Sequence, residues 1–302
     1  MTTISTKDME TIKALAMRIE EKLEGVTVEP VEVSKNNGIR LGLKFRREGE
    51  EISPTLYPQG SDLRDAKDDL DEVADRLAQI YLDHKKENED GYLSEAVKVV
   101  KRFETSKDRL RLMVINEKSN QGYIQGRPYR KIMGDLVVLV YVEIGSDEEG
   151  KGTGQVTITN DLLDAWKKDF DEVYDQAYEN MRDQVFESTM AQIMIERFGL
   201  TEEEAAVGFP IETIVFSNKG LYRGAGVLPV VIDDLKERFG RFIILPSSIH
   251  EFIVMPVDDE EFENGVVGCL NDMVEYISNN EIDLEDKLSD HAYYYDGSQF
   301  VI

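Results

Sequence analysis

The chain has 302 residues, of which 61 are Asp or Glu and 35 are Lys or Arg, so its formal net charge is -26 at pH 7. This charge makes direct binding to nucleic-acid phosphates or to anionic lipid unfavourable. Hydrophobic residues make up 41% of the chain, which is enough to bury a core and excludes a wholly disordered polypeptide. A binding partner is therefore expected to be a protein with a neutral or basic surface.

The sequence also limits the compartment and the redox chemistry. Residues 1–10 lack the basic and apolar regions of a secretory signal, and no apolar run approaches the roughly 20 residues of a membrane span. We expect a cytoplasmic protein with no membrane partner. The single cysteine, Cys269, excludes an intrachain disulfide and a cysteine-clustered zinc site, and its apolar neighbours predict that it is buried.

Residues 1–105 are predicted to form an N-terminal helix-hairpin-helix α+β lobe. Apolar residues recur with helical spacing over 5–24, and Gly25 is placed to end that helix. Two alternating stretches flank Asn36-Asn37-Gly38 and predict a β-hairpin whose Pro30-containing strand lies at an edge. A short strand at 52–57, a helix of more than twenty residues from an N-cap at Ser61, and a helix over 92–103 should follow.

Residues 106–302 are predicted to form a C-terminal α+β lobe. Its strongest strand signal is the apolar run 135–144, which is expected to be buried on both faces. The other predicted elements begin with a strand at 109–116 and a loop at 119–134. The stretch 156–181 predicts a short strand and then a helix capped by Thr159 or Asn160. After it come a helix at 185–198, a helix capped by Thr201 and Glu204, a strand at 211–218, and a helix beginning at Pro229. Paired strands at 242–245 and 252–255, a helix with an acidic first turn after Asp258, and an aromatic hairpin at Asp296-Gly297 complete the lobe. The predicted fold class is α+β, with mixed, mostly antiparallel sheets packed with amphipathic helices in two lobes.

Two phrases in the C-terminal lobe are distinctive, LPSSIHEFIVMP at 245–256 and LSDHAYYYD at 288–296. With the order of the other elements they resemble a bacterial family catalogued as domain of unknown function 5688, over most of the chain. A more distant similarity is to the YtpQ-like proteins. The resemblance implies a cytoplasmic bacterial protein with a mixed α+β fold, often encoded near mobile elements, and it implies no catalytic residues.

The first phrase places Ser247, Ser248, His250 and Glu251 close together, which suggests a Ser-His-acid site. The strained G-x-S-x-G elbow is absent, and in a strand His250 and Glu251 would point to opposite faces. We therefore favour a turn whose serines bond the backbone, and we assign no catalytic residue.

A metal site formed by His250, Glu251, Asp290 and His291 is a further idea, because both histidines lie beside carboxylates. No ligand-spaced motif supports it, so we predict no metal and no cofactor. The arginines Arg127, Arg130 and Arg223 could hold an anionic ligand or pair with the acidic surface, and the excess of carboxylates favours pairing.

The leading hypothesis is a non-enzymatic binding or regulatory protein that acts through protein-protein recognition, of unspecified oligomeric state. In a sharper version it mimics nucleic acid, with two acidic arrays in place of phosphates. One is the face between Asp258 and Asp286, which has eleven acidic residues and no Lys or Arg, and the other is the predicted helix between Asp62 and Asp75. The competing hypothesis is a hydrolase or metal-dependent enzyme that uses His250 and His291 with neighbouring carboxylates. The candidate binding residues are Ser247, Ser248, His250, Glu251, His291 and Arg223, and the acidic face comprises Asp258, Asp259, Glu260, Glu261 and Glu263.

Overall fold

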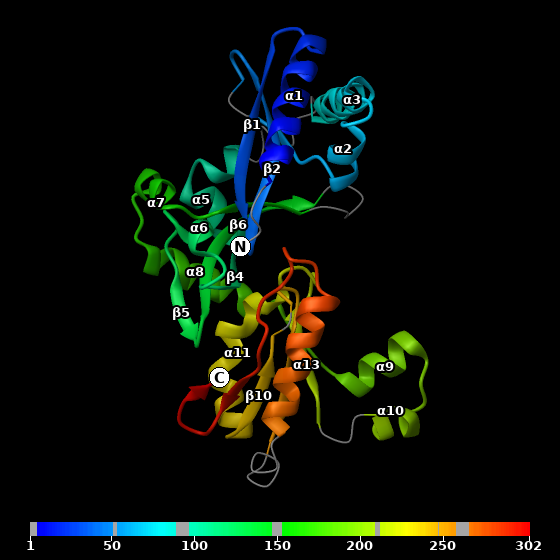
Figure 1. Cartoon of the computed structure of the whole chain (residues 1–302). Coiled ribbons are helices and arrows are strands. Elements are labelled where there is room, and N and C mark those ends of the chain that lie inside the picture. The colour runs from blue at the N-terminus through cyan, green and yellow to red at the C-terminus, as the bar shows by residue number, and fades with distance from the viewer. Residues whose placement is uncertain are drawn as a thin grey trace. The chain divides into compact units, whose positions relative to one another are not determined.

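The computed structural model describes residues 5–50, 53–88, 97–146, 153–208, 212–246, 248–257 and 266–302. The chain forms two compact units, Met1–Lys98 and Val99–Ile302, and Figure 1 shows their elements. Each unit combines helices with antiparallel sheet, so the predicted α+β class is confirmed.

The first unit packs helices against a three-stranded sheet of order β1-β2-β3 in the described residues. The apolar faces of α1 and α3 meet the inner face of the hairpin, where the rings of Phe45 and Tyr81 stack with centroids 4.4 Å apart. Its elements are α1 (Thr6–Lys22), β1 (Val26–Lys35), β2 (Gly38–Arg47), β3 (Thr55–Leu56), α2 (Gly60–Asp65) and α3 (Leu70–Asn88).

The hairpin prediction is confirmed, with β1 and β2 paired in one continuous antiparallel register around Asn36 and Asn37. Asn37 adopts a left-handed conformation with a φ of 60°, which asparagine tolerates in tight turns. β1 lies at the edge of the sheet, where Pro30 costs no ladder hydrogen bond to a further strand.

The long helix predicted from Ser61 is wrong in one respect, because it is broken into α2 and α3. The N-cap of α2 is Gln59, whose backbone N–H donates to Asp62 Oδ2 in a capping box. A turn follows, and Asp69 Oδ1 accepts a hydrogen bond from the backbone of Glu72 at 2.9 Å. Asp69 therefore acts as an N-cap that starts a second helix.

The second unit contains two antiparallel sheets. Residues 97–100 are helical, and the rest of the helix predicted at 92–103 lies partly outside the described residues. The elements of the unit are α5 (Phe103–Ser106), the 3₁₀ helix η1 (Lys107–Arg109), β4 (Leu110–Asn116), α6 (Gln121–Ile124), β5 (Arg130–Met133), β6 (Leu136–Ser146), β7 (Thr153–Thr157), α7 (Asn160–Trp166), α8 (Phe170–Arg182), β8 (Val185–Thr189), α9 (Met190–Phe198), α10 (Glu202–Gly208), β9 (Ile214–Asn218), the 3₁₀ helix η2 (Gly224–Val227), α11 (Leu228–Phe239), β10 (Phe242–Leu245), β11 (Phe252–Pro256), α13 (Val266–Asn280), β12 (Tyr293–Tyr295) and β13 (Phe300–Val301).

The second unit includes the residues just before the predicted lobe boundary at 105. The indole N–H of Trp166 donates to the backbone oxygen of Val100 at 2.8 Å, which ties this segment to α7. Trp166 is buried.

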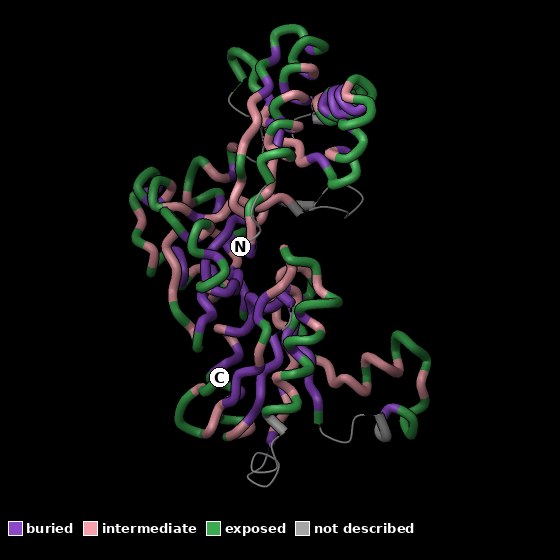
Figure 2. Tube along the Cα trace, viewed as in Figure 1, coloured by how far each residue is buried: buried purple, intermediate pink, exposed green. Residues whose placement is uncertain are grey.

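The smaller sheet is organised around β6, which pairs with β4 along one side and with β5 and β7 along the other. Its residues from Leu136 to Val142 are all buried, as the apolar run predicted, and Figure 2 shows buried residues concentrated in the strands. The segment predicted as a loop at 119–134 also contains α6 and β5, because Arg130 and Lys131 pair with the start of β6.

The larger sheet has the strand order β13-β12-β10-β11-β9-β8. β10 and β11 form the predicted antiparallel pair, and the predicted C-terminal hairpin adds β12 and β13 beside β10. α13 covers this sheet with Leu270 and Val274, whereas Cys269 is exposed, so its predicted burial is wrong.

Two further helix predictions need correction. Residues 160–177 form α7 and α8, which are separated by Lys167 in a left-handed conformation with a φ of 56° and by the N-cap Asp169. The first five residues of the helix predicted at 185–198 are instead β8, which pairs with β9, and α9 follows from its N-cap Thr189. The acidic first turn predicted after Asp258 lies outside the described residues, and α13 is described from Val266 to Asn280, so that part of the prediction stays untested.

Candidate functional site

Two of the predicted site residues, His250 and Arg223, come together at one end of the larger sheet. The His250 Nδ1 accepts a hydrogen bond from the backbone N–H of Arg223 at 3.2 Å. Its Nε2 lies 3.1 Å from Asp286 Oδ1, and its ring lies 5.6 Å from that of Tyr222. Because Nδ1 accepts a hydrogen bond, Nε2 bears the hydrogen and its N–H donates a hydrogen bond to Asp286. The imidazole therefore links two loops rather than facing a reaction partner.

Ser248 is buried and accepts a hydrogen bond from the His250 backbone N–H at 3.0 Å, which is the turn role predicted for the serines. Ser248 also forms an isolated antiparallel bridge with Lys287. Glu251 is exposed and is not a partner of His250. Ser247 lies outside the described residues, so its predicted role stays a prediction.

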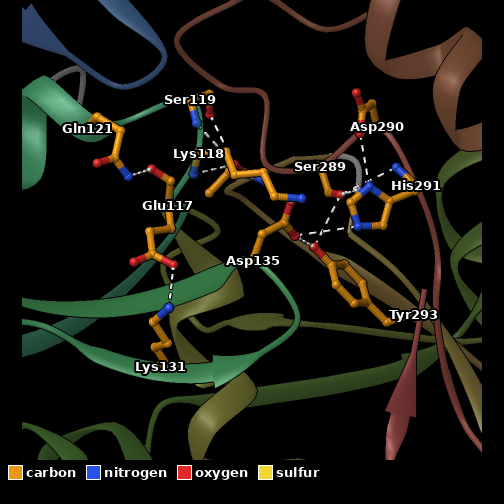
Figure 3. Close-up of polar contacts among 11 residues, drawn as sticks. Glu117, Lys118, Ser119, Gln121, Lys131, Asp135, Ser289, Asp290, His291 and Tyr293 are labelled. Atoms are coloured by element: carbon orange, nitrogen blue, oxygen red, sulfur yellow. Dashed lines mark hydrogen bonds and ion pairs between the residues drawn. The ribbon is translucent and has the colours of Figure 1, made fainter.

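His291 lies in a second cluster, shown in Figure 3, with Asp135 and Tyr293. The Tyr293 hydroxyl donates to Asp135 Oδ1, and His291 Nε2 lies 3.4 Å from the same oxygen. On its other side, His291 Nδ1 lies 2.9 Å from Asp290 Oδ1. The second Asp135 oxygen lies 3.2 Å from Lys118 Nζ.

This second cluster is almost closed to solvent. Asp135 is 5% exposed, Ser289 is 3% exposed and Tyr293 is fully buried. Burial by itself raises the pKa of the Asp135 carboxyl, but hydrogen bonds from Tyr293, Asn116 and Lys118 outweigh burial, so this pKa lies below its ordinary value. Burial and the bond to Asp135 raise the pKa of the Tyr293 phenol. Asp135 is thus held as a buried anion by three donors.

The two histidines do not form one catalytic unit, because their partners differ. His250 contacts Asp286 and the loop at Arg223, whereas His291 contacts Asp135 and Asp290. Ser289, whose hydroxyl lies 3.3 Å from His291 Nδ1, is too deeply buried to meet a substrate. Within the described ranges no group of three or more His, Cys, Asp and Glu residues is placed to hold a metal ion. The hydrolase hypothesis gains no support from this geometry.

The expectation that the arginines pair with carboxylates is confirmed for Arg130 and wrong for Arg223. Arg130 Nη2 lies 2.7 Å from Asp171 Oδ1. The guanidinium carbon of Arg130 lies 3.8 Å from the centre of the Tyr174 ring, so the two groups stack. The Arg223 guanidinium instead contacts the Tyr222 hydroxyl and the sulfur of Met113, and no carboxylate of the described residues pairs with it.

Sequence reasoning missed Asp135, Tyr293 and Asp286. Asp135 and Tyr293 are 158 residues apart, so no local pattern joins them. A usable signal was available for Asp135, since an acidic residue directly before a fully buried strand requires donors from elsewhere in the fold.

A family model described as a family of unknown function (DUF5688) matches residues 9–297. The chain belongs to this family. The match spans both units and all the candidate site residues, and it carries no activity. No curated protein and no solved structure matches the chain. The more distant similarity to the YtpQ-like proteins stays a prediction.

Among the described residues, no helix combines the length and apolar character needed to cross a membrane.

Proposed function

We propose that this member of the family is a non-enzymatic binding protein that recognises a partner protein through helix α9. The observation that carries the proposal is that α9 is apolar around most of its circumference, yet it contains no buried residue. A helix with so broad an apolar face normally packs that face against a core. We therefore expect the apolar surface of α9 to be buried against another molecule.

The apolar side chains of α9 are distributed over the whole helix. Of its nine residues, only Gln192, Glu196 and Arg197 are polar. Within the second unit it packs against β8 and α10, where Ala205 is buried, but Figure 2 shows α9 as intermediate or exposed along its length. Phe198 at its end is 70% exposed. Its apolar residues are Met190, Ala191, Ile193, Met194, Ile195 and Phe198.

The surroundings of α9 define the chemistry of the partner. Between Asp183 and Glu212 the chain has seven acidic residues and one arginine. Glu202, Glu203 and Glu204 of α10 are all exposed. A second copy of the chain would bring like charges together, whereas an apolar segment bordered by Lys and Arg would match both the apolar face and its acidic rim.

The nucleic-acid mimic version of the proposal lacks comparable support. The acidic face Asp258, Asp259, Glu260, Glu261 and Glu263 lies outside the described residues. In the first unit, Asp62 is buried and bonded to Arg76, and Asp71 and Asp75 pair with Arg18 and Lys22, so these carboxylates are partly neutralised.

The proposal is tested with two helical peptides that share one leucine face and differ only in whether lysine or glutamate borders it. Fluorescence anisotropy should show that the lysine peptide binds and the glutamate peptide does not. We expect the double variant Ile193→Ser, Phe198→Ala to weaken lysine-peptide binding at least about tenfold, because two large apolar contacts are lost. Raising the salt concentration should also weaken it, because the acidic rim is exposed.

The matched control is Met17→Ala, which removes a side chain that is 66% exposed on α1 of the first unit. It should bind the lysine peptide as the unaltered protein does. The proposal is wrong if neither peptide binds, or if the α9 variant and the control bind equally. A dimer in light scattering that the α9 substitutions abolish would assign α9 to a second copy instead.

A further inference from the structure

The Arg223 side chain is held at a surface loop with no counter-charge. Its Nε lies 3.4 Å from the Tyr222 hydroxyl, and Nη1 lies 4.0 Å from the Met113 sulfur. Neither group carries a negative charge, and within the part of the chain that the structure describes no carboxylate joins them. A cation without a partner is unexpected in a chain with 26 excess negative charges.

The backbone that presents Arg223 is strained and firmly held. Leu221 and Arg223 adopt left-handed conformations with φ of 53° and 51°, which non-glycine residues seldom do. Asn218 holds the loop through hydrogen bonds to both the N–H and the carbonyl of Tyr222, and His250 accepts the N–H of Arg223. Strained residues that the surroundings hold in place occur mostly at functional sites.

A second group near Arg223 also lacks a partner. Tyr141 of β6 is 2% exposed, and its hydroxyl has no hydrogen-bond partner among the described residues. The residue as a whole is buried but its hydroxyl is not, so the hydroxyl is the part of Tyr141 that a ligand can reach. Tyr141 lies on the same face of the sheet as Met113 and packs in one cluster with it, and the Arg223 guanidinium contacts the Met113 sulfur. Burial raises the pKa of Tyr141, and the positive charges of Arg223 and Arg111 oppose that rise. Arg111 pairs with Glu143 at 3.0 Å, so of these two arginines Arg223 is the one that can bind an anion.

We infer that Arg223, with the hydroxyls of Tyr141 and Tyr222, forms a binding site for a small molecule that carries a phosphate or carboxylate group. A guanidinium donates two parallel hydrogen bonds to either group, and a phenol adds a third donor. The nearby carboxylates do not occupy the site, since Glu143 pairs with Arg111 and Asp286 with His250. The burial of Tyr141 restricts the site to a compact ligand, and the net charge of the chain excludes a polyanion. The site is separate from α9 and independent of the function proposed above.

The test titrates inorganic phosphate and, separately, acetate into the full chain at constant ionic strength, with NMR detection of arginine Nε–H signals. At least one probe should shift the Arg223 signal to saturation, and the comparison decides between phosphate and carboxylate. Arg223→Ala and Tyr141→Phe should raise the Kd about tenfold and about fivefold, because each removes a donor to the anion. Arg223→Lys, which keeps the charge and loses the paired donors, should fall between the unaltered protein and Arg223→Ala.

The control is Arg130→Ala, because Arg130 is already paired with Asp171 and its loss should change the Kd less than about twofold. If neither probe binds with a Kd below about 50 mM, the interaction is negligible and the inference is wrong. An equal loss of affinity in Arg130→Ala and Arg223→Ala would also overturn it. If Arg223→Ala does not fold, Arg223→Lys and Tyr141→Phe decide the question by the same criterion.

Discussion

The two histidines of the second unit lie in matching sequence contexts and in different physical surroundings. Each follows a serine by two residues and has a carboxylate as its neighbour in the chain. His250 links an exposed loop to Asp286, whereas His291 is part of a buried network around Asp135. Figure 3 shows how that network joins the end of the chain to the start of β6.

The difference shows that the neighbour in sequence is a poor guide to the charged partner. Glu251 follows His250 but is exposed, because consecutive residues at a strand end point to opposite sides. At His291 the neighbour Asp290 does form a hydrogen bond with the ring. The buried network around the ring, however, is centred on Asp135 and not on Asp290. Side chains around His250 are partly exposed to solvent, whereas those around His291 are buried. The following predictions test that contrast.

The largest effect is expected from Gly224→Ala in the His250 region. A Cβ at this position would lie 2.0 Å from Ser217 Oγ and 2.2 Å from the His250 carbonyl oxygen. We expect a loss of more than about 3 kcal/mol in the free energy of unfolding, because the sheet backbone itself must move. Urea denaturation measures it. Gly268→Ala, where nothing lies within 4 Å of the added Cβ, should be neutral or stabilising. Equal effects of the two substitutions would contradict the tight approach at Gly224.

The next effect is expected at the buried cluster, from Asp135→Ala. This substitution leaves the fully buried Tyr293 hydroxyl without its acceptor, and we expect a loss of about 2–4 kcal/mol in the free energy of unfolding. Asp286→Ala, whose side chain is 45% exposed, should cost less than about 1 kcal/mol. Similar losses for both would remove the distinction between the two histidine regions. Chemical denaturation of both variants under one buffer condition gives the comparison.

A smaller effect is the dependence of stability on pH. The folded-state pKa of Asp135 lies below its unfolded value, so its contribution is present above the unfolded pKa of about 3.9 and is lost as pH falls through the folded pKa. The difference in unfolding free energy between the protein and Asp135→Asn should therefore shrink as pH is lowered from about 5 towards 2.5. A difference that stays constant over this range would show that Asp135 has an ordinary pKa.

The smallest effect is expected from Glu251→Gln. Glu251 is exposed and does not pair with His250, so the free energy of unfolding should change by less than about 0.5 kcal/mol. Thermal unfolding detects a larger change readily. A loss comparable to that of Asp286→Ala would mean that Glu251 supports His250 after all.

Local signals predicted many elements because short-range chemistry decided them. The Asn36-Asn37 turn fixed the first hairpin, and the Thr201 hydroxyl and Glu204 carboxylate formed the expected cap of α10. The missed breaks were also local. Asp69 and Asp169 each begin the pattern Asp-x-Asp-Glu and each accept a hydrogen bond from the glutamate backbone, so both mark a helix start inside an apolar run with helical spacing.

The candidate site could be predicted only in part. The phrase around His250 indicated a polar turn between two strands, and that turn exists. The pairing of His250 with Asp286, the isolation of Arg223 and the partnership of Tyr293 with Asp135 depend on tertiary contacts between distant segments. Periodicity carries no information about such contacts, because it reports which face of an element is buried and not what covers it.

The position of β12 next to β10 has a consequence for how the protein is made. β12 supplies the neighbour of β10 on the side away from β11, and Tyr293 of β12 donates to Asp135, 158 residues earlier. Until residues 293–301 have left the ribosome, β10 presents an unpaired edge and Asp135 lacks its main donor. The second unit must therefore complete its folding after nearly all of it has been synthesised, whereas the first unit, closed by contacts within Met1–Lys98, can fold while translation continues.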